Sequence, residues 1–288
     1  MPRRLSPVDR LFLVFLAAIG LLVAWFHASV PHAGALLAAH ALGSLLILVF
    51  ACIPGIPGAF VFRHWYPVPY IAFCYFETDF IIPGIHAGVL DAKFASWDAA
   101  FWGVQPAVWF ERIHSPALTE LLQIAYALFA PSILLIAFIY WFSKRVADFR
   151  YYAFLASLGF LVSYAGYYLV PVEGPRFFMP GTSPLTGLWL FAPLRFVVDS
   201  ASSHYDCFPS GHIELTILAW WSSRQISPVL SAAYAVFLLC MVVATVYLRY
   251  HYTIDLFAGI LTAAAVLIVV PRIYGNTHHG PPRNHARL

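Results

Sequence analysis

Long apolar runs separated by short polar stretches dominate this chain. Each run has close to the roughly 20 residues that a helix needs to cross a bilayer. They predict membrane-spanning helices at about 11–27, 35–53, 116–143, 151–170, 210–226, 229–249 and 252–271. Pro131 interrupts one of these runs, so we expect a kink in that helix.

The segment 65–84 is the ambiguous part of this pattern, because it is apolar and aromatic but contains Glu77 and Asp79. Cytoplasmic loops favour Lys and Arg, so charge counting can arbitrate. If the segment crosses, eleven of the 16 basic residues share one side, opposite Lys93, Arg112, Arg176, Arg195 and Arg249. If it does not, the split is nine against seven. We therefore predict eight spans with cytoplasmic termini; seven spans are the alternative.

Two further segments differ from the apolar runs. Residues 85–115 combine scattered charges with three tryptophans, Trp97, Trp102 and Trp109, and this pattern is typical of an amphipathic segment at the outer membrane interface. Such a segment is either a lid or lipid guide over a site, or a surface anchor. The polar end of the chain is predicted to be disordered. The expected organisation is membrane helices and an interfacial segment at 1–115, a catalytic helix bundle at 116–271, and a polar tail at 272–288.

Composition supports the membrane assignment. The 288 residues are 61% hydrophobic and only 10% charged, with a mean hydropathy of +0.78, whereas a soluble domain has roughly a quarter charged residues. The fold class expected is therefore an all-α, polytopic membrane helix bundle. A net charge of +3 is too small to indicate nucleic-acid binding. The four cysteines have no CxxC spacing and indicate neither a zinc site nor disulfides; Cys207 is expected to pack rather than to act as a nucleophile.

Three short polar clusters lie at helix ends on one face of the predicted bundle: 174–176, 209–212 and 249–255. Charged side chains in a membrane protein are costly and usually functional. In the first cluster, Arg176 follows a Gly-Pro pair, and its planar guanidinium suits phosphate oxygens. Taken alone, Arg176 is better explained as an arginine that snorkels to the interface.

The second cluster, Pro-Ser-Gly-His, opens an apolar helix. Ser210 is well placed as the N-cap, and the helix N-terminus favours an anion. His212 follows in the first turn, within reach of that anion. Glu214 is most simply a carboxylate that stabilises the helix start, with a catalytic role as the less favoured alternative.

The third cluster contains Arg249, His251 and Asp255. On a helix, residues four apart share a face, so Asp255 is expected to hydrogen-bond His251 and to set its tautomer. The alternative is a structural polar pair between helices. Together, the clusters supply what phosphoryl transfer needs: cations, a helix N-terminus and two histidines. We expect no cofactor and no metal, because the arginines and the helix N-terminus provide the positive field.

The ordered trio of GPR, FPSGH and RYHYTID resembles the type-2 phosphatidic acid phosphatase superfamily, whose fold is shared with vanadium haloperoxidases. The resemblance covers about 116–265. It implies that His251 is the nucleophile and forms a phosphohistidine, that Asp255 is its partner, and that His212 is the general acid and base. It also implies that phosphate is held by Arg176, Ser210, Gly211 and Arg249.

Two positions depart from the usual lipid phosphatase pattern. Leu169 stands seven residues before the first arginine, where that pattern has a lysine, and Thr245 stands six before the nucleophilic histidine, where it has an arginine. Both departures resemble the branch that contains inositol phosphorylceramide synthase and sphingomyelin synthase. Gly211, directly before the histidine, is more similar to the phosphatases, so the acceptor stays open.

The sequence thus predicts an integral membrane lipid phosphatase or phosphotransferase that acts on a lipid phosphate or phospholipid head group. The acceptor is water or, in a head-group transferase, an alcohol such as inositol or a ceramide-type lipid. The expected location is a bacterial inner membrane with the site on the extracytoplasmic side. Alternatives of another class are a transporter, whose buried charges would line a pathway, and a catalytically inactive relative.

Overall fold

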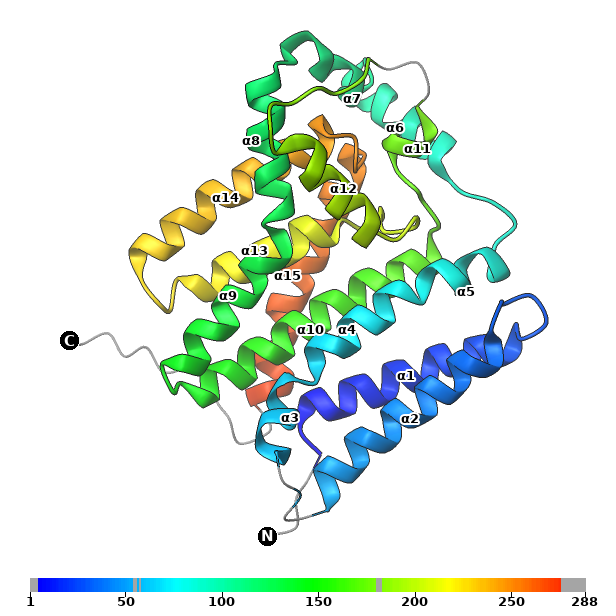
Figure 1. Cartoon of the computed structure of the whole chain (residues 1–288), viewed down its shortest axis with the longest axis vertical. Coiled ribbons are helices and arrows are strands. Elements are labelled where there is room, and N and C mark those ends of the chain that lie inside the picture. Colours follow the sequence, from blue (N-terminus) through cyan, green and yellow to red (C-terminus); the bar gives the residue numbers. More distant parts are fainter. Residues whose placement is uncertain (1–4, 54–55, 57, 180–182, 276–288) are drawn as a thin grey trace.

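The computed structural model describes residues 5–53, 56, 58–179 and 183–275, and within these ranges every regular element is a helix (Figure 1). The first two helices, α1 (Pro7–Trp25) and α2 (Ala33–Cys52), pack against each other along their length. The ambiguous segment forms three short helices, which are α3 (Ala59–Trp65), α4 (Pro67–Phe76) and α5 (Thr78–Ile85). Pro67 has no backbone N–H with which to continue α3. Figure 1 shows α4 and α5 lying along the longer helix α10.

The segment 85–115, expected at the membrane interface, contains three short helices. They are α6 (Asp91–Trp102), α7 (Pro106–Trp109) and the 3-10 helix η1 (Phe110–Ile113). Gly103 ends α6 in the left-handed conformation that glycine adopts without steric cost.

The remaining helices form the bundle that carries the clusters. They are α8 (Pro116–Ala127), α9 (Phe129–Phe142), α10 (Val146–Leu169), α13 (Gly211–Ser223), α14 (Pro228–Tyr247) and α15 (Thr253–Gly275). Two shorter helices, α11 (Pro175–Phe178) and α12 (Phe191–Ala201), lie in the connection between α10 and α13. Helix α13 is central, because α9, α10, α14 and α15 all pack against it.

Helices α8 and α9 meet at Leu128 with a bend of 44°. Pro131 lacks the N–H that would bond to the carbonyl of Ala127, four residues earlier. The kink predicted from Pro131 is therefore confirmed, one turn before the proline.

Fewer helices qualify as membrane spans by length and composition than the eight spans predicted. Within the described residues, five helices are long and apolar enough to cross a membrane, namely α1, α2, α10, α14 and α15, and the bent pair α8 and α9 would be a sixth. The predicted span at 210–226 is the 13-residue α13, and the segment 65–84 is broken into short helices. Helix α15 continues to Gly275, past the expected start of the tail, and 276–288 lie outside the described residues.

A close helix contact sets the position of the second cluster. A Cβ atom at Gly259 of α15 would lie 2.6 Å from the carbonyl oxygen of Ser210. Only glycine allows this approach. The N-terminus of α13 is thereby held directly against the first turns of α15.

Candidate active site

The three clusters meet at one end of the bundle, at the starts of α11, α13 and α15 (Figure 1). Gly174 has a φ of +99°, and a Cβ atom there would lie 2.6 Å from the carbonyl oxygen of Tyr250. The first and third clusters are thus in backbone contact, and a larger residue at Gly174 would separate them.

The two histidines face each other. Nε2 of His251 lies 3.2 Å from Nδ1 of His212, and Nδ1 of His251 lies 2.9 Å from the carbonyl oxygen of Cys207. A carbonyl oxygen only accepts hydrogen bonds, so Nδ1 of His251 is the nitrogen that carries the hydrogen. The lone pair of neutral His251 is therefore on Nε2, directed at His212.

Asp255 acts differently from the prediction. Helix α15 begins at Thr253, so His251 lies in the turn before the helix and not on a shared helical face. Oδ2 of Asp255 lies 3.5 Å from Nδ1 of His251, while the hydrogen bond of Nδ1 goes to the carbonyl oxygen of Cys207. The same carboxylate oxygen accepts the backbone N–H of Tyr252 at 2.8 Å. Asp255 thus orders the turn that holds His251 and provides a nearby negative charge.

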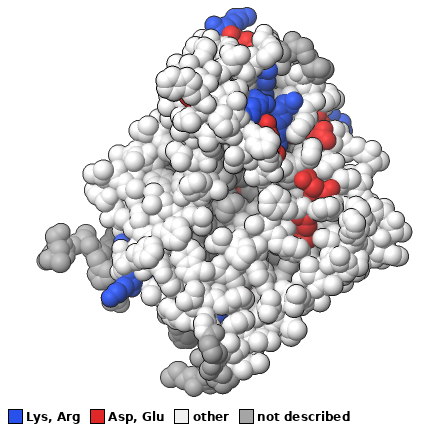
Figure 2. Space-filling view, viewed as in Figure 1, with Lys and Arg blue, Asp and Glu red and all other residues white. Residues whose placement is uncertain are grey.

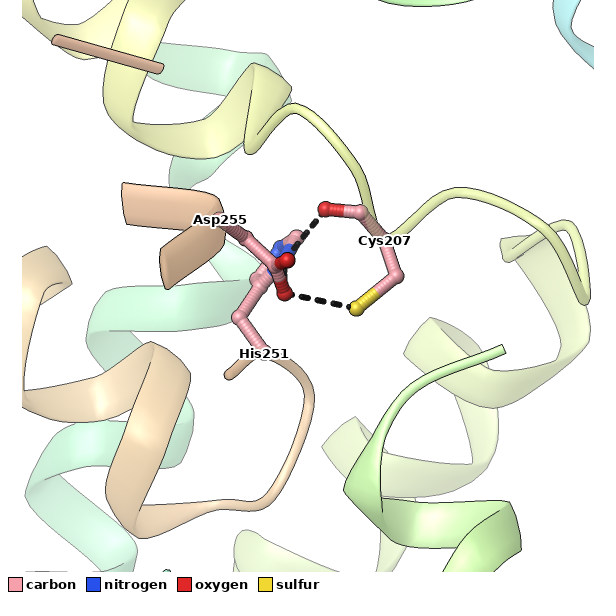
Figure 3. Close-up of side chains that lie close together, drawn as sticks. All are labelled: Cys207, His251 and Asp255. Carbon is pink, nitrogen blue, oxygen red and sulfur yellow. Dashed lines mark hydrogen bonds and ion pairs between the residues drawn. The ribbon is translucent and has the colours of Figure 1, made fainter. Parts of the chain in front are cut away.

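Cys207 is a member of this cluster that the sequence interpretation treated as packing. Its thiol donates to Oδ2 of Asp255 at 2.8 Å, beside the ring of His251 (Figure 3). Burial, and then the charge of Asp255, raise the pKa of the Cys207 thiol well above its ordinary value. Ligand atoms of Cys207, His251 and Asp255 lie within 4.8 Å of one another, as they would in a metal site. Two hydrogen bonds connect the three residues: the thiol of Cys207 donates to Asp255, and Nδ1 of His251 donates to the carbonyl oxygen of Cys207.

His212 is held between aromatic rings from both sides of the α8–α9 bend. Tyr126, near the end of α8, stacks on the His212 ring at 4.4 Å, and Phe129, at the start of α9, lies 4.3 Å from it. Tyr126 also stacks on Tyr250 of the third cluster at 4.1 Å. The kink thus places two rings against the candidate general acid.

Ser210 caps α13, as predicted. Its hydroxyl oxygen accepts the backbone N–H of Ile213 at 3.4 Å, and its own backbone N–H donates to the carbonyl oxygen of Asp255 at 3.1 Å. The cap uses the hydroxyl only as an acceptor, so the O–H can still donate to an anion. Gly211 is the buried first residue of the helix, where backbone N–H groups have no intrahelical partner.

Arg176 does not snorkel, because only 5% of its side chain is exposed. Its guanidinium donates to Oδ1 of Asp199 at 3.4 Å and to the carbonyl oxygen of Ser203 at 3.2 Å, and it pairs with Asp206 at 3.5 Å. It also lies over the ring of Tyr250, 4.9 Å from the ring centre. Arg176 is therefore a buried cation inside the site.

A cavity of about 280 Å³ adjoins these groups, and three arginines contribute to its wall. It is lined by Pro175, Arg176, Pro184, Leu185, Phe191, Arg195 and Arg249. Figure 2 shows basic atoms gathered in the upper part of this face with acidic atoms beside them, on a surface that is otherwise largely uncharged. Arg249 pairs with Glu111 of η1 at 2.8 Å. Burial lowers the pKa of Arg249, and the charge of Glu111 opposes this effect.

Arg195 is the cation that the motifs did not predict. It lies on α12, outside all three clusters, and pairs with Asp199 one turn later at 3.3 Å. The i, i+4 spacing of Arg195 and Asp199 in a segment with apolar residues is the signal that could have indicated a helix there.

The carboxylates of Glu214 and Asp98 each accept hydrogen bonds from other helices. Glu214 accepts the hydroxyls of Ser163 on α10 and Thr262 on α15, at 2.7 and 2.8 Å, so it joins three helices. Asp98 of α6 accepts the backbone N–H and the hydroxyl of Thr253, both at 2.7 Å, at the start of α15.

Leu169 and Thr245, the two positions where the lipid phosphatase pattern has a lysine and an arginine, contribute no cation to the site. Leu169 is 76% exposed, and the hydroxyl of buried Thr245 donates to the carbonyl oxygen of Val242.

Comparison with known proteins agrees with this geometry. The family model of the PAP2 superfamily matches residues 93–269, a range that contains all three clusters. A PA-phosphatase related-family protein of Dictyostelium discoideum is 30% identical over 98 residues; the alignment covers 32% of this chain and only 18% of that relative. No solved structure matches the chain significantly. The family match spans more than half of the chain, and the chain belongs to the PAP2 superfamily.

Proposed function

We propose that this protein is a membrane lipid phosphatase or phosphotransferase that works through a phosphohistidine on His251. The observation that carries the proposal is the contact of 3.2 Å between Nε2 of His251 and Nδ1 of His212. The carbonyl of Cys207 sets the tautomer that leaves Nε2 as a nucleophile. Arg176, which lines the arginine-walled cavity, lies over Tyr250 in the ring stack that reaches His212.

In the first step, the lone pair on Nε2 of His251 attacks phosphorus. The P–N bond forms as the P–O bond to the lipid breaks, and the leaving oxygen takes a proton from His212. Arg176, Arg249 and the N-terminus of α13, with Ser210 and Gly211, stabilise the negative charge on the phosphoryl oxygens. Because these groups supply the positive field, activity is expected to persist in a chelator.

In the second step, an acceptor oxygen attacks phosphorus and gives its proton to His212, and the P–N bond breaks. Water as the acceptor releases free phosphate. An alcohol such as inositol, or a ceramide-type lipid, would instead receive the phosphoryl group. With eight spans and cytoplasmic termini, the site would face the extracytoplasmic side of a bacterial inner membrane.

The test is a panel of lipid phosphates given to the purified protein, with and without inositol or diacylglycerol. Free phosphate identifies a phosphatase, and labelled acceptor identifies a transferase. Changing His251 to Ala should lower turnover by about a thousandfold or more, because the nucleophile is removed. Changing His212 to Asn should cost about a hundredfold, because the leaving oxygen loses its proton donor.

Labelled phosphate should be trapped on wild-type protein and on His212→Asn, but not on His251→Ala. The matched control is His27→Ala, which removes an exposed histidine from the turn between α1 and α2. Unchanged turnover in His251→Ala would contradict the phosphohistidine on His251. No turnover by the wild-type protein across the whole panel would favour a transporter or an inactive relative.

A further inference from the structure

The charges around the cavity lined by Arg176, Arg195 and Arg249 are balanced. Its three arginines are each paired with at least one carboxylate: Asp199 contacts Arg176 and Arg195, Asp206 contacts Arg176, and Glu111 contacts Arg249. Three positive charges thus face three negative charges. A phosphate dianion that entered this arrangement would be opposed by the carboxylates unless one of them moved away.

The three carboxylates are not equally fixed. Asp206 is 9% exposed, and its Oδ2 accepts the hydroxyl of Tyr75 at 2.5 Å. Asp199 is 42% exposed; its distances to the two arginines, 3.4 and 3.3 Å, are similar to the 3.5 Å between Asp206 and Arg176, so exposure is what distinguishes the two carboxylates. Exposed ion pairs of this kind contribute little stability. Of the two, Asp199 is therefore the carboxylate that can break its ion pairs with the arginines at the lower cost in free energy.

Helix α12 is held at the end that is distant from Asp199. Glu120 of α8 accepts the backbone N–H groups of Leu190 and Phe191 at 2.5 and 2.8 Å, at the start of α12. Asp199 lies near the other end of this helix, where its remaining contact is the hydroxyl of Tyr250 at 3.1 Å. This anchoring keeps Arg195, in the second turn, at the cavity wall while the side chain of Asp199 can turn into solvent.

Arg195 is connected to the histidines through stacked rings. Its guanidinium lies 6.0 Å from the ring centre of Tyr250, and that of Arg176 lies 4.9 Å from the same ring. Tyr250 stacks on Tyr126, which stacks on His212. Two arginines of the cavity wall are therefore connected to His212 through the stacked rings of Tyr250 and Tyr126.

We propose that Arg195 is a third phosphate-binding arginine, and that the carboxylate of Asp199 occupies the place of a phosphate oxygen in the empty protein. The proposal rests on the proposed function. A phosphate group, in a phosphomonoester or as inorganic phosphate, displaces Asp199 and takes its partners, Arg176 and Arg195. Asp199 thus competes with the substrate and weakens the binding of phosphate.

The two side chains then have opposite effects, and equilibrium binding of inorganic phosphate to the detergent-purified full chain measures them. Arg195→Gln should weaken binding about tenfold, because a charge-assisted hydrogen bond to phosphate is lost. Asp199→Asn should tighten binding about threefold to tenfold, because the competing charge is removed while an acceptor for Tyr250 stays.

Matched controls separate this effect from a general change in charge. Asp148→Asn removes a carboxylate that pairs with Arg145 three residues earlier, away from the cavity. Arg112→Gln removes an exposed arginine from η1 that does not line the cavity. Both controls should bind phosphate as the wild type does.

Opposite shifts for Arg195→Gln and Asp199→Asn, with unchanged controls, support the proposal. Equal losses in the two variants, no shift in either, or no phosphate binding by wild-type protein overturn it. Opposite shifts in a protein that turns over no lipid phosphate would refute the proposed function and leave the cavity assignment standing. Turnover of lipid phosphate with no shift of phosphate binding in either variant would refute the assignment of Arg195 and Asp199 and leave the proposed function standing.

Discussion

At the scale of single residues, the site depends on hydrogen bonds that determine which nitrogen of His251 is reactive. The carbonyl of Cys207 fixes the hydrogen on Nδ1, and the thiol of the same residue donates to Asp255. The backbone of Cys207 thus bonds His251, and its side chain bonds Asp255, both residues of the third cluster. The motif contains the histidine and the aspartate, but their connection is supplied by a residue 44 positions earlier.

Cys207 offers a direct test of this connection. Cys207→Ala removes the donor to the buried carboxylate of Asp255, and we expect about a tenfold lower kcat with a nearly unchanged KM, because a donor to a charged group is lost. Cys207→Ser keeps a donor of similar size and should retain most of the activity. Steady-state kinetics of the two variants check the prediction, and equal losses in both would show that only the volume of the sulfur matters.

At the scale of elements, the interfacial helix α6 is a brace for the catalytic loops. Asp91 accepts the backbone N–H groups of Glu173 and Gly174 and the hydroxyl of Tyr252. Asp98 accepts the backbone N–H of Thr253, the first residue of α15. Three aromatic residues of the helix, Trp97, Phe101 and Trp102, are exposed, whereas Phe94 is buried against Cys207 and Tyr252. Neither of the two interpretations from sequence, a lid or a surface anchor, includes these contacts with two of the three clusters.

Removal of one contact of this brace should affect both stability and turnover. Asp98→Ala deletes the acceptor for the first N–H groups of α15, which costs about 1 kcal/mol as for other helix caps. It should also lower kcat severalfold, because His251 lies two residues before that helix. Thermal unfolding and turnover measure the two effects.

Ser96→Ala is the control on the same helix, since its hydroxyl contacts only the carbonyl of Lys93. It should leave both quantities unchanged. If Asp98→Ala lowered stability and left kcat intact, α6 would be structural only.

At the scale of the whole molecule, the N-terminal helices and the catalytic bundle are joined at the loop that leads into α13. Tyr75 of α4 donates to Asp206 and accepts the backbone N–H of Ser203. Asp79 of α5 accepts the hydroxyl of Ser203 and the backbone N–H of His204. Because Asp206 also pairs with Arg176, the first 115 residues take part in placing this proposed phosphate ligand.

Tyr75→Phe tests this long-range support. It removes the donor to Asp206 and the acceptor for Ser203, so the loop should loosen and KM for a lipid phosphate should rise severalfold. The matched control is Tyr70→Phe, which removes a tyrosine hydroxyl that bonds the carbonyl of Gly43, within the N-terminal helices. A rise of KM in both variants would show a general loss of stability rather than a defect of the loop.

Much of the element structure follows from local pattern. Apolar runs of sufficient length predicted α1, α2, α10, α14 and α15, and Pro131 predicted the bend before α9, because hydrophobicity and a missing N–H act over one or two turns. The N-cap at Ser210 followed from the same kind of local chemistry. Helix α12 and the breaks between α3, α4 and α5 were not predicted, since short helices depend on their tertiary contacts.

The sequence by itself determined the membrane class, the order of the three clusters and the residue types that phosphoryl transfer needs, because composition and short motifs are local properties of the chain. Only the tertiary structure decided that His251 precedes its helix, that Cys207 joins it to Asp255, and that Arg176 and Arg195 line one cavity and both contact Asp199. These relations connect residues far apart in the chain, and helix packing, with a close approach such as that of Gly259 to Ser210, brings them within hydrogen-bonding distance.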